Sequence, residues 1–394
     1  MTIPLSQRVQ RIKPSPTLAV TARAAAMRAA GHDVIGLGAG EPDFDTPEHI
    51  KQAAIEAIRA GMTKYTPVDG IPSLKQAVIA KFRRDNGLEY QPDQILVSCG
   101  GKQSFYNLAQ ALLDAGDEVI IPAPYWVSYP DMVLLADAKP VIVAAGQDQK
   151  FKITPAQLEA AITPRTKLFV LNSPSNPTGQ AYSREELAGL AEVLLKHPQV
   201  VIASDDMYEH IVWEAGGFCN ILNVCPELYD RTLVLNGVSK AYSMTGWRIG
   251  YAGGPKEVIQ AMKKIQSQST SNPTSISQAA AQAALEGDQS CIAEMLKAFK
   301  QRHDFVVERL NRIPGIDCLA TDGTFYVFPN VEGMIAALDG IDDDVALAEY
   351  LIEKAGVALV PGSAFGAPGH VRISIATSME NLQQALERIV TVAG

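Results

Sequence analysis

The segment Asn236-Gly-Val-Ser-Lys-Ala-Tyr-Ser-Met-Thr-Gly-Trp-Arg-Ile-Gly-Tyr251 is the centre around which the chain is organised. It follows the apolar run Thr232–Leu235 and leads into Ile249–Ala252, and both runs are typical of buried strands. The loop between them is rich in small residues and carries Lys240 and Arg248. Desolvation in such a loop lowers the pKa of a lysine, which a Schiff-base lysine requires. A lone loop lysine is, however, most often solvated, so the surrounding chain must support the functional interpretation.

Strand and helix patterns alternate on both sides of this loop. Solidly apolar strands separated by helices predict an α/β domain whose mostly parallel sheet is covered on both faces. The expected strands are 94–98, 118–121, 140–143, 166–171 and 200–203, and the expected helices are 72–85, 102–113 and 184–196. The glycines at 36, 38 and 40 do not predict a dinucleotide loop, because the third is misplaced and Pro42 follows where a helix should begin.

The pattern changes near residue 275. Long helical patterns and short strands follow each other there, which indicates an α+β segment. We expect helices at 275–286, 289–312, 343–355 and from Ser378, and strands at 357–360 and 370–375. Near the N-terminus we expect helices at 16–30 and after Thr46, with Thr46 as N-cap and Pro47 at the first helical position. The predicted division is a large domain at 46–288 and a small domain made of 1–45 and 289–394.

Composition limits the class of protein. The chain has 394 residues, 47% of them hydrophobic, and a net charge of −9, which argues against a nucleic-acid binder. No apolar run reaches the roughly 18 residues that span a membrane, and no signal peptide is visible. The five cysteines are scattered without a C-x-x-C and the six histidines are isolated, so neither a disulfide framework nor a metal site is expected. A cytoplasmic location is the simplest expectation.

Two predicted strand ends carry residues suited to anions and turns. Gly100-Gly101 lies between a strand and a helix, where bare backbone N–H groups can bind a phosphate. Lys102 follows in the first helical turn, where a cation opposes the helix dipole; either it binds an anion or its side chain reaches water. Asn176 begins Asn-Pro-Thr-Gly179, which alone indicates only a turn.

Other strand ends carry a carboxylate, aromatic rings and an arginine. Asp205 follows four apolar residues and needs a partner, such as a pyridinium N–H, unless it caps a helix. Tyr208 could reach the same ring, and Trp126 could stack on it or fill a core. Arg372 lies in the apolar run Val371–Ile375, where its guanidinium suits a substrate carboxylate or an internal ion pair. With Lys240, these residues are most economically explained by pyridoxal phosphate acting on an amino acid.

From about residue 10 to its end, the chain resembles the class I aminotransferases of the fold type I pyridoxal-phosphate family, in particular bacterial aspartate aminotransferases. The resemblance implies a large domain with a mostly parallel seven-stranded sheet, a smaller α+β domain and a homodimer with active sites at the subunit interface. It is carried by motifs at Ala39–Phe44, Thr63–Thr66, Gly100–Gln103, Pro124–Trp126, Asn176–Gly179, Ser204–Tyr208, Ser239–Tyr251 and His370–Ile373.

The resemblance implies a role for each candidate residue at the cofactor. Lys240 would form the Schiff base and move the proton between substrate and cofactor, and Asp205 would pair with the pyridine nitrogen. The ring would contact Trp126, Asn176 and Tyr208. The phosphate would lie against Gly100, Gly101, the Lys102 backbone, Ser239 and Arg248, with Tyr65 reaching it from the neighbouring subunit.

The resemblance also implies the substrate contacts. Arg372, Asn176 and the Gly40 backbone would bind the α-carboxylate, next to Trp126. Lys102 and Ser15 would bind a distal carboxylate, which favours the functional interpretation of Lys102. The chain departs from the family pattern at Ser175, Asp206 and Gly237, and the last of these removes a possible phosphate-binding hydroxyl.

These expectations lead to one principal function and several alternatives. The principal function is transfer of the amino group of L-aspartate to 2-oxoglutarate by a ping-pong mechanism. The alternatives are a prephenate, aromatic or alanine-type aminotransferase, with Arg11 and Lys13 available as extra cations, or a β-lyase of the same fold. A non-enzymatic regulator of this fold is disfavoured by the acidic charge and the missing N-terminal helix-turn-helix.

Overall fold

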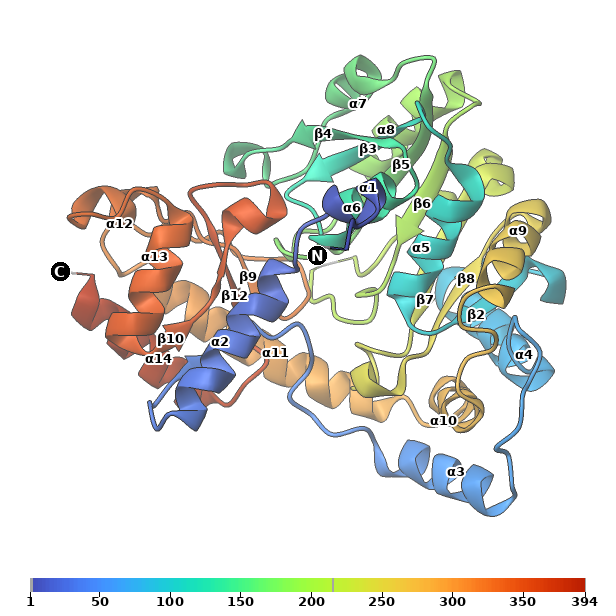
Figure 1. Ribbon diagram of the computed structural model, residues 1–394, viewed down its shortest axis with the longest axis horizontal. Helices are drawn as coiled ribbons and strands as arrows, with labels where there is room; N and C mark the ends of the chain where they lie inside the picture. Colours follow the sequence, from blue (N-terminus) through green and yellow to red (C-terminus); the bar gives the residue numbers. More distant parts are fainter. Residues whose placement is uncertain (1–2, 215, 394) are drawn as a thin grey trace.

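A seven-stranded sheet dominates the computed structural model, which describes residues 3–214 and 216–393 (Figure 1). Its strand order is β2-β8-β7-β6-β5-β3-β4. β8 runs antiparallel to both neighbours and the other strands run parallel, which confirms the predicted mostly parallel sheet. The strands are β2 (Ile95–Ser98), β3 (Glu118–Ala123), β4 (Lys139–Ala144), β5 (Thr166–Asn172), β6 (Val201–Asp205), β7 (Thr232–Gly237) and β8 (Gly250–Gly253).

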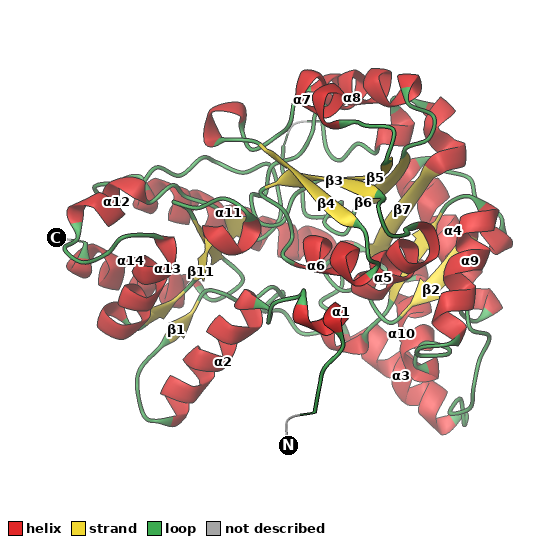
Figure 2. Cartoon of the chain, turned by 45° about the horizontal axis from the view of Figure 1, so that its top comes forward, coloured by secondary structure: helices red, strands yellow, loops and turns green. Residues whose placement is uncertain are grey.

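Helices cover both faces of this sheet because successive strand residues point to opposite sides (Figure 2). In β5, Leu168 and Val170 belong to one buried cluster, and Phe169 and Leu171 belong to another. The first cluster includes α5 (Gly101–Leu112), α6 (Ser128–Leu135) and α9 (Lys256–Ser267). The second includes α3 (Glu48–Arg59), α4 (Pro72–Lys81), α7 (Pro155–Ala161), α8 (Arg184–Lys196) and α10 (Ser275–Glu286).

A second part of the molecule has its own buried core and small sheets. β1 (Ile35–Gly36) pairs in parallel with β10 (Val357–Ala358), and β12 (Val371–Ser374) lies antiparallel between β11 (Val360–Pro361) and β9 (Tyr326–Val327). Its helices are α2 (Pro16–Ala29), α11 (Ser290–Leu310), α12 (Glu332–Ala337), α13 (Asp344–Tyr350) and α14 (Met379–Val392). In Figure 1, α11 runs from this part towards the large sheet.

These separate cores support a proposed division into a large domain at 46–288 and a small domain at 1–45 and 289–394. Residues 1–2 and 394 of that division lie outside the described residues. The short helix α1 (Gln7–Gln10) contacts α6 of the large part, and Arg8 and Arg11 both pair with Asp137 at the end of α6. The N-terminal segment therefore bridges the two parts of the molecule.

Four local expectations were wrong. The helix expected at 72–85 is α-helical only through Lys81 and continues as a π-helical turn at Phe82–Asn86. The helix after Thr46 begins at Glu48 with Pro47 in the capping position, while the Thr46 hydroxyl donates to Ser243 O and accepts from Trp247 Nε1. The run 357–360 is not one strand, because it divides at Leu359 into β10 and β11, which belong to different sheets. The helix expected at 343–355 is α-helical only through Tyr350 and continues as a π-helical turn. In residues 3–214 and 216–393, no helix is both long and apolar enough to cross a membrane.

Candidate active site

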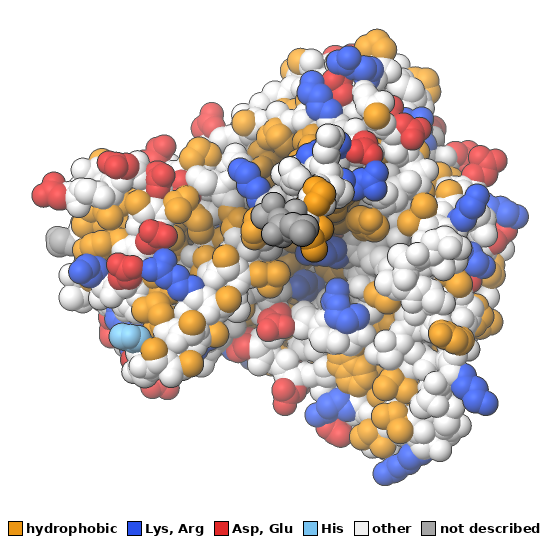
Figure 3. Space-filling view, viewed as in Figure 1, with side chains coloured by type: hydrophobic (Ala, Val, Ile, Leu, Met, Phe, Trp, Pro, Cys, Tyr) orange, Lys and Arg blue, Asp and Glu red, His pale blue; other side chains and the backbone are white. Residues whose placement is uncertain are grey.

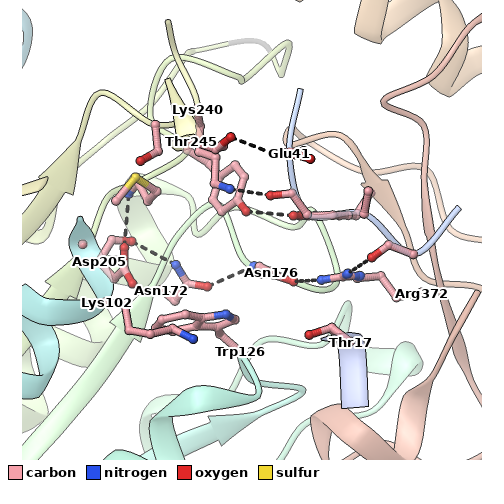
Figure 4. Close-up of a pocket in the computed structure, with 18 of the residues that line it drawn as sticks. Thr17, Glu41, Lys102, Trp126, Asn172, Asn176, Asp205, Lys240, Thr245 and Arg372 are labelled. Carbon is pink, nitrogen blue, oxygen red and sulfur yellow. Dashed lines mark hydrogen bonds between the residues drawn. The ribbon is translucent and has the colours of Figure 1, made fainter. Parts of the chain in front are cut away.

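A cavity of about 440 Å³ lies where the carboxyl ends of β5, β6 and β7 face the small part of the molecule. Figure 3 shows Lys and Arg side chains gathered at this hollow, and Figure 4 shows side chains converging on it from both parts. Most of the predicted site residues therefore meet in one place, as parallel strand ends should. They are Gly40, Gly101, Lys102, Trp126, Asn176, Asp205, Tyr208, Ser239, Lys240, Arg248 and Arg372.

Lys240 points into the cavity from the loop after β7. Its Nζ donates to Gly40 O at 2.5 Å and lies 5.9 Å from the centre of the Tyr208 ring. Burial, together with the nearby Arg372 cation, lowers the pKa of Lys240 to about 8. About a tenth of this amine is therefore uncharged at pH 7, far more than for an ordinary lysine, which makes it a better nucleophile and base.

Asp205 ends β6 and is held by donors on both oxygens. Its Oδ2 accepts from the Tyr129 hydroxyl at 2.5 Å and its Oδ1 accepts from Met207 N at 3.3 Å. Burial raises the pKa of Asp205, and the hydrogen bond from Tyr129 acts against that rise. Asn172 Nδ2 donates to Asp205 O at 3.0 Å, and Asn172 Oδ1 accepts from Asn176 N at 3.0 Å. One network thus orients Asp205 and Asn176 relative to each other.

The start of α5 and Arg248 form an anion-binding corner. Gly100 has a φ of +86°, and a Cβ added there would lie 2.3 Å from Arg248 Nη2, so only glycine fits. Gly100 itself lies behind the cavity wall, whereas Gly101, Ser239 and Arg248 line it. Arg248 Nη1 donates to Thr245 O at 2.8 Å. Backbone N–H groups at the helix start and a guanidinium are suited to a phosphate.

The departure at Gly237 has a steric explanation. A Cβ at this position would lie 3.0 Å from Ile249 O and 3.1 Å from Gly250 Cα, on the neighbouring strand β8. A serine or alanine here would require β8 to shift. The phosphate corner therefore relies on other residues.

Arg372 is a buried guanidinium that has no carboxylate partner among residues 3–214 and 216–393. Only 2% of the residue is exposed, and its Nη1 and Nη2 donate to Asn176 Oδ1 at 2.9 Å and to Gly38 O at 2.8 Å. Within the described part of the chain, its Nε has no hydrogen-bond partner. Its guanidinium lies 4.4 Å from the centre of the Tyr326 ring. A buried cation bonded only to neutral oxygens is prepared for an anionic ligand.

Lys102 and α2 form the rest of the wall. Lys102 Nζ lies 5.1 Å from the Trp126 ring, and burial, with a contribution from Arg248, lowers the pKa of Lys102. Ser15 does not line the cavity: it precedes α2, and its hydroxyl lies 2.9 Å from the Thr17 hydroxyl. Thr17, with Leu18 and Thr21, lines the cavity instead. Tyr65 lies outside the cavity and is 91% exposed.

Several cavity residues were missed in the sequence. They are Tyr129, Tyr326, Glu41, Thr245 and Asn172. The Tyr208 and Tyr326 hydroxyls lie 3.0 Å apart, and Thr245 Oγ1 donates to Glu41 Oε2 at 2.7 Å. The only available signal for Tyr129 and Thr245 was their closeness in sequence to Trp126 and Arg248, whereas Tyr326 carried no signal at all.

A buried polar network supports the Lys240 loop from behind. Glu209 accepts hydrogen bonds from Lys81 Nζ, from Asn86 Nδ2 at 2.6 Å and from Asn236 Nδ2 at 2.7 Å. Asn236 Oδ1 in turn accepts from Gly237 N at 2.7 Å. Glu209 also lies near Asp85 and His210, a grouping that sequence reading did not anticipate. Lys81 pairs with Glu209 and Arg84 pairs with Asp85, so the two carboxylates are balanced by two cations, as is typical of a structural ion-pair network.

The cavity fits pyridoxal phosphate by its donor set. The anion corner at Gly101 and Arg248 suits the phosphate, the Trp126 ring suits stacking on a pyridine, and Asp205 suits a ring N–H. Lys240 supplies the amine that this cofactor requires. The orphaned Nε of Arg372 marks a separate place for a substrate anion in the same cavity.

Comparison with known proteins gives a consistent result. The family described as "Aminotransferase class I and II" matches residues 32–389. An aspartate/prephenate aminotransferase of Nitrosomonas europaea is 62% identical over 98% of this chain and 99% of its own length. An aspartate aminotransferase of Geobacillus stearothermophilus is 53% identical over 98% of both chains.

Solved structures agree with these relatives. The crystal structure of the aspartate aminotransferase from Rhizobium meliloti superposes with a TM-score of 0.96 and 52% identity, covering 100% of this chain and 99% of the other. The Thermus thermophilus aspartate aminotransferase with maleate has a TM-score of 0.93 and 46% identity, covering 99% and 100%. The extent of these matches and the geometry of the cavity lead to the same conclusion: the chain belongs to the class I and II aminotransferases and is a pyridoxal-phosphate-dependent enzyme.

Proposed function

We propose that this aminotransferase moves the amino group of L-aspartate to 2-oxoglutarate by a ping-pong mechanism. The observation that carries the proposal is a pair of cations in one cavity: Arg372, bonded only to neutral oxygens, and Lys102, beside Trp126. Both substrates carry two carboxylates, so two cations are a matched set of partners. The names of the Nitrosomonas and Geobacillus relatives support the same substrate.

In this proposal the large sheet holds the cofactor. Gly101, Ser239 and Arg248 would hold the phosphate, Trp126 would stack on the ring, and Asn176 and Tyr208 would bond its 3-oxygen. Asp205 would accept a hydrogen bond from the ring nitrogen and so favour its protonated form. Bound pyridoxal phosphate supplies an electron-withdrawing ring that stabilises negative charge on a substrate α-carbon.

The opposite wall holds the substrate. Arg372 binds the α-carboxylate together with Asn176 and the Gly40 backbone. Lys102 binds the distal carboxylate together with Thr17, whose hydroxyl lies 2.9 Å from that of Ser15. These contacts orient the α-hydrogen towards Lys240, since proton transfer requires the base within hydrogen-bond reach.

Lys240 is the base that moves the proton. Its Nζ would take the proton from the substrate α-carbon and hold it beside the cofactor site. When 2-oxoglutarate later occupies the same cavity, Lys240 would return a proton to the α-carbon of the new amino acid. The lowered pKa of Lys240, about 8, places its uncharged form within the working range of a base near neutrality.

The direct test is a half-reaction. Purified holoenzyme is mixed with L-aspartate alone, and the visible absorbance of the cofactor is followed by stopped flow. We expect a saturable loss of that absorbance, and its return on addition of 2-oxoglutarate. An unchanged spectrum with aspartate, alongside a response to another amino acid, would replace the proposed substrate.

Prephenate is a second candidate acceptor. The Nitrosomonas relative is named for both substrates, and Leu18, which is 69% exposed, offers an apolar contact at the cavity wall. Of the two expected extra cations, Arg11 is occupied by an ion pair with Asp137 at 2.5 Å, so Lys13 is the more available. Comparing turnover of prephenate, phenylpyruvate, pyruvate and 2-oxoglutarate tests this alternative, and assays for released ammonia test the β-lyase.

We also propose a homodimer that shares its active sites. Tyr65, expected at the phosphate of the neighbouring subunit, is almost fully exposed and lies outside the cavity of its own chain. Ile55 and Ile58 on α3 are also exposed, which supports an interface on that side. Light scattering tests the dimer, and Tyr65→Phe should weaken cofactor binding without changing the mass. A monomeric, fully active holoenzyme would contradict the proposal.

A further inference from the structure

Tyr129 is a fully buried phenol next to the cofactor site. Only 1% of Tyr129 is exposed, and its hydroxyl donates a hydrogen bond to Asp205 Oδ2 at 2.5 Å. Its ring packs against Phe105 at 4.9 Å between ring centres and edge-on against Trp126 at 5.1 Å. Packing on these neighbours holds the hydroxyl towards Asp205.

The hydrogen bond has a defined direction. Burial, with the nearby charge of Asp205, raises the pKa of Tyr129 well above its ordinary value, so the phenol stays protonated and donates. Asp205 is partly exposed to the cavity, and desolvation raises the pKa of its carboxyl. A donor on the carboxylate favours the charged form and opposes that rise. The second hydrogen bond to this carboxylate, from Met207 N to Asp205 Oδ1, is longer, at 3.3 Å.

We propose that Tyr129 is a positioning residue that keeps Asp205 anionic and aims it at the ring nitrogen of the cofactor. The inference rests on the proposed role of Asp205 and adds a residue that acts through it. Without the phenol O–H, the Asp205 carboxylate would bind a proton more readily and would be freer to turn. The ring nitrogen would then lose part of the negative partner that keeps it protonated.

A purely structural role for Tyr129 is the competing explanation. Tyr129→Phe separates the two, because phenylalanine keeps the ring between Phe105 and Trp126 and removes only the hydroxyl. The variant is prepared as holoenzyme with pyridoxal phosphate labelled with ¹⁵N in the ring. The ¹⁵N chemical shift, recorded from pH 5 to pH 10, reports protonation of the ring nitrogen directly and needs no substrate.

We expect the ring nitrogen of Tyr129→Phe to lose its proton about one pH unit or more below the wild type. The dissociation constant for the cofactor should rise roughly tenfold, in line with loss of one hydrogen bond to a charged group. A ¹⁵N titration identical to that of the wild type would overturn the proposal.

Tyr182→Phe is the matched control. Tyr182 is also a buried phenol, 8% exposed, and its oxygen accepts from Ile153 N at 2.9 Å without touching Asp205. Its loss should leave the ¹⁵N titration unchanged. A shift equal to that of Tyr129→Phe would show general loosening of the fold and would also overturn the proposal.

Asp205→Asn separates this inference from the proposed function. We expect this variant to shift the titration further than Tyr129→Phe. If the ¹⁵N titration of Asp205→Asn matched that of the wild type, both the proposed role of Asp205 and the inferred role of Tyr129 would be overturned. A large shift in Asp205→Asn with none in Tyr129→Phe would overturn the role of Tyr129 alone, whatever amino acid the enzyme prefers.

Discussion

The two walls of the cavity are built in different ways. The sheet wall takes Gly101, Asp205 and Lys240 from positions directly after strands of one sheet, so strand topology alone brings them together. On the other wall, Arg372 bonds Gly38 O, a contact between residues 334 positions apart. We infer that the sheet wall sets the chemistry through the cofactor, whereas the wall made from the two ends of the chain, together with Lys102 at the start of α5, selects the substrate.

The largest expected effect lies on the sheet wall. Lys240→Ala should lower turnover by roughly 10⁴-fold or more, because the base is lost. The visible absorbance that depends on this lysine should also disappear, while the fold and part of the cofactor binding remain. Turnover assays, absorbance spectra and far-UV circular dichroism measure these three properties. Lys139→Ala, whose side chain is 67% exposed, is the control and should behave as wild type. Normal turnover of aspartate by Lys240→Ala would refute the role of this loop.

Arg372→Leu should weaken substrate binding at the opposite wall and leave cofactor binding at the sheet wall intact. Loss of the buried Arg372 guanidinium should lower kcat/KM for every amino acid by roughly 10²- to 10³-fold, mostly through KM. This corresponds to about 3–4 kcal/mol of transition-state stabilisation. The spectrum of the bound cofactor should still show a filled site. Arg372→Lys should recover little, since a single ammonium cannot form the two-pronged contact. A variant that lost its cofactor but bound substrate analogues normally would contradict the division between the walls.

Lys102→Met is a finer test of substrate selection. Removing the ammonium should lower kcat/KM for aspartate by roughly tenfold and leave alanine nearly unchanged, because alanine has no distal carboxylate. The measured quantity is the ratio of the two kcat/KM values. An equal loss for both amino acids would place Lys102 at the cofactor rather than at the distal carboxylate.

The pH dependence is the smallest expected effect. Folding lowers the pKa of Lys240 from 10.5 to about 8, so its uncharged form grows as pH rises through 8. Cofactor-free protein should therefore regain visible absorbance with pyridoxal phosphate faster at pH 8.5 than at pH 7, by roughly an order of magnitude. In Arg372→Leu the midpoint should move upwards, because a neighbouring cation is gone. A midpoint that stayed in place would mean that Arg372 does not act on Lys240.

Sequence patterns predicted the sheet wall well. Short apolar runs followed by Gly100-Gly101, Asp205 or Lys240 located both the strands and their functional ends, because side-chain alternation and strand ends are local features. The boundaries were less certain: Pro47 rather than Thr46 occupies the cap of α3, since the Thr46 hydroxyl is used by Ser243 and Trp247.

The residues that support the site were much harder to predict. Tyr129 in α6 and Tyr326 in β9 occupy positions whose sequence pattern indicates only burial. The packing of distant elements brings the Tyr129 hydroxyl to Asp205 and the Tyr326 hydroxyl to Tyr208. The Glu209 network joins Asn86 to Asn236, which are 150 positions apart in the sequence, and no local pattern indicates such a contact. Ser15 lies just outside the cavity and Thr17, two residues later, lines it, a difference that depends on how the start of α2 packs.

A crystal structure of the holoenzyme with succinate tests the central claim most directly, since this dicarboxylate has the carbon skeleton of the substrate but no amino group to react. We expect the cofactor ring to lie on the sheet wall with its nitrogen at Asp205. One succinate carboxylate should bind Arg372, and the other should lie near Lys102. Succinate bound away from Arg372, or a ring nitrogen turned away from Asp205, would contradict the central claim.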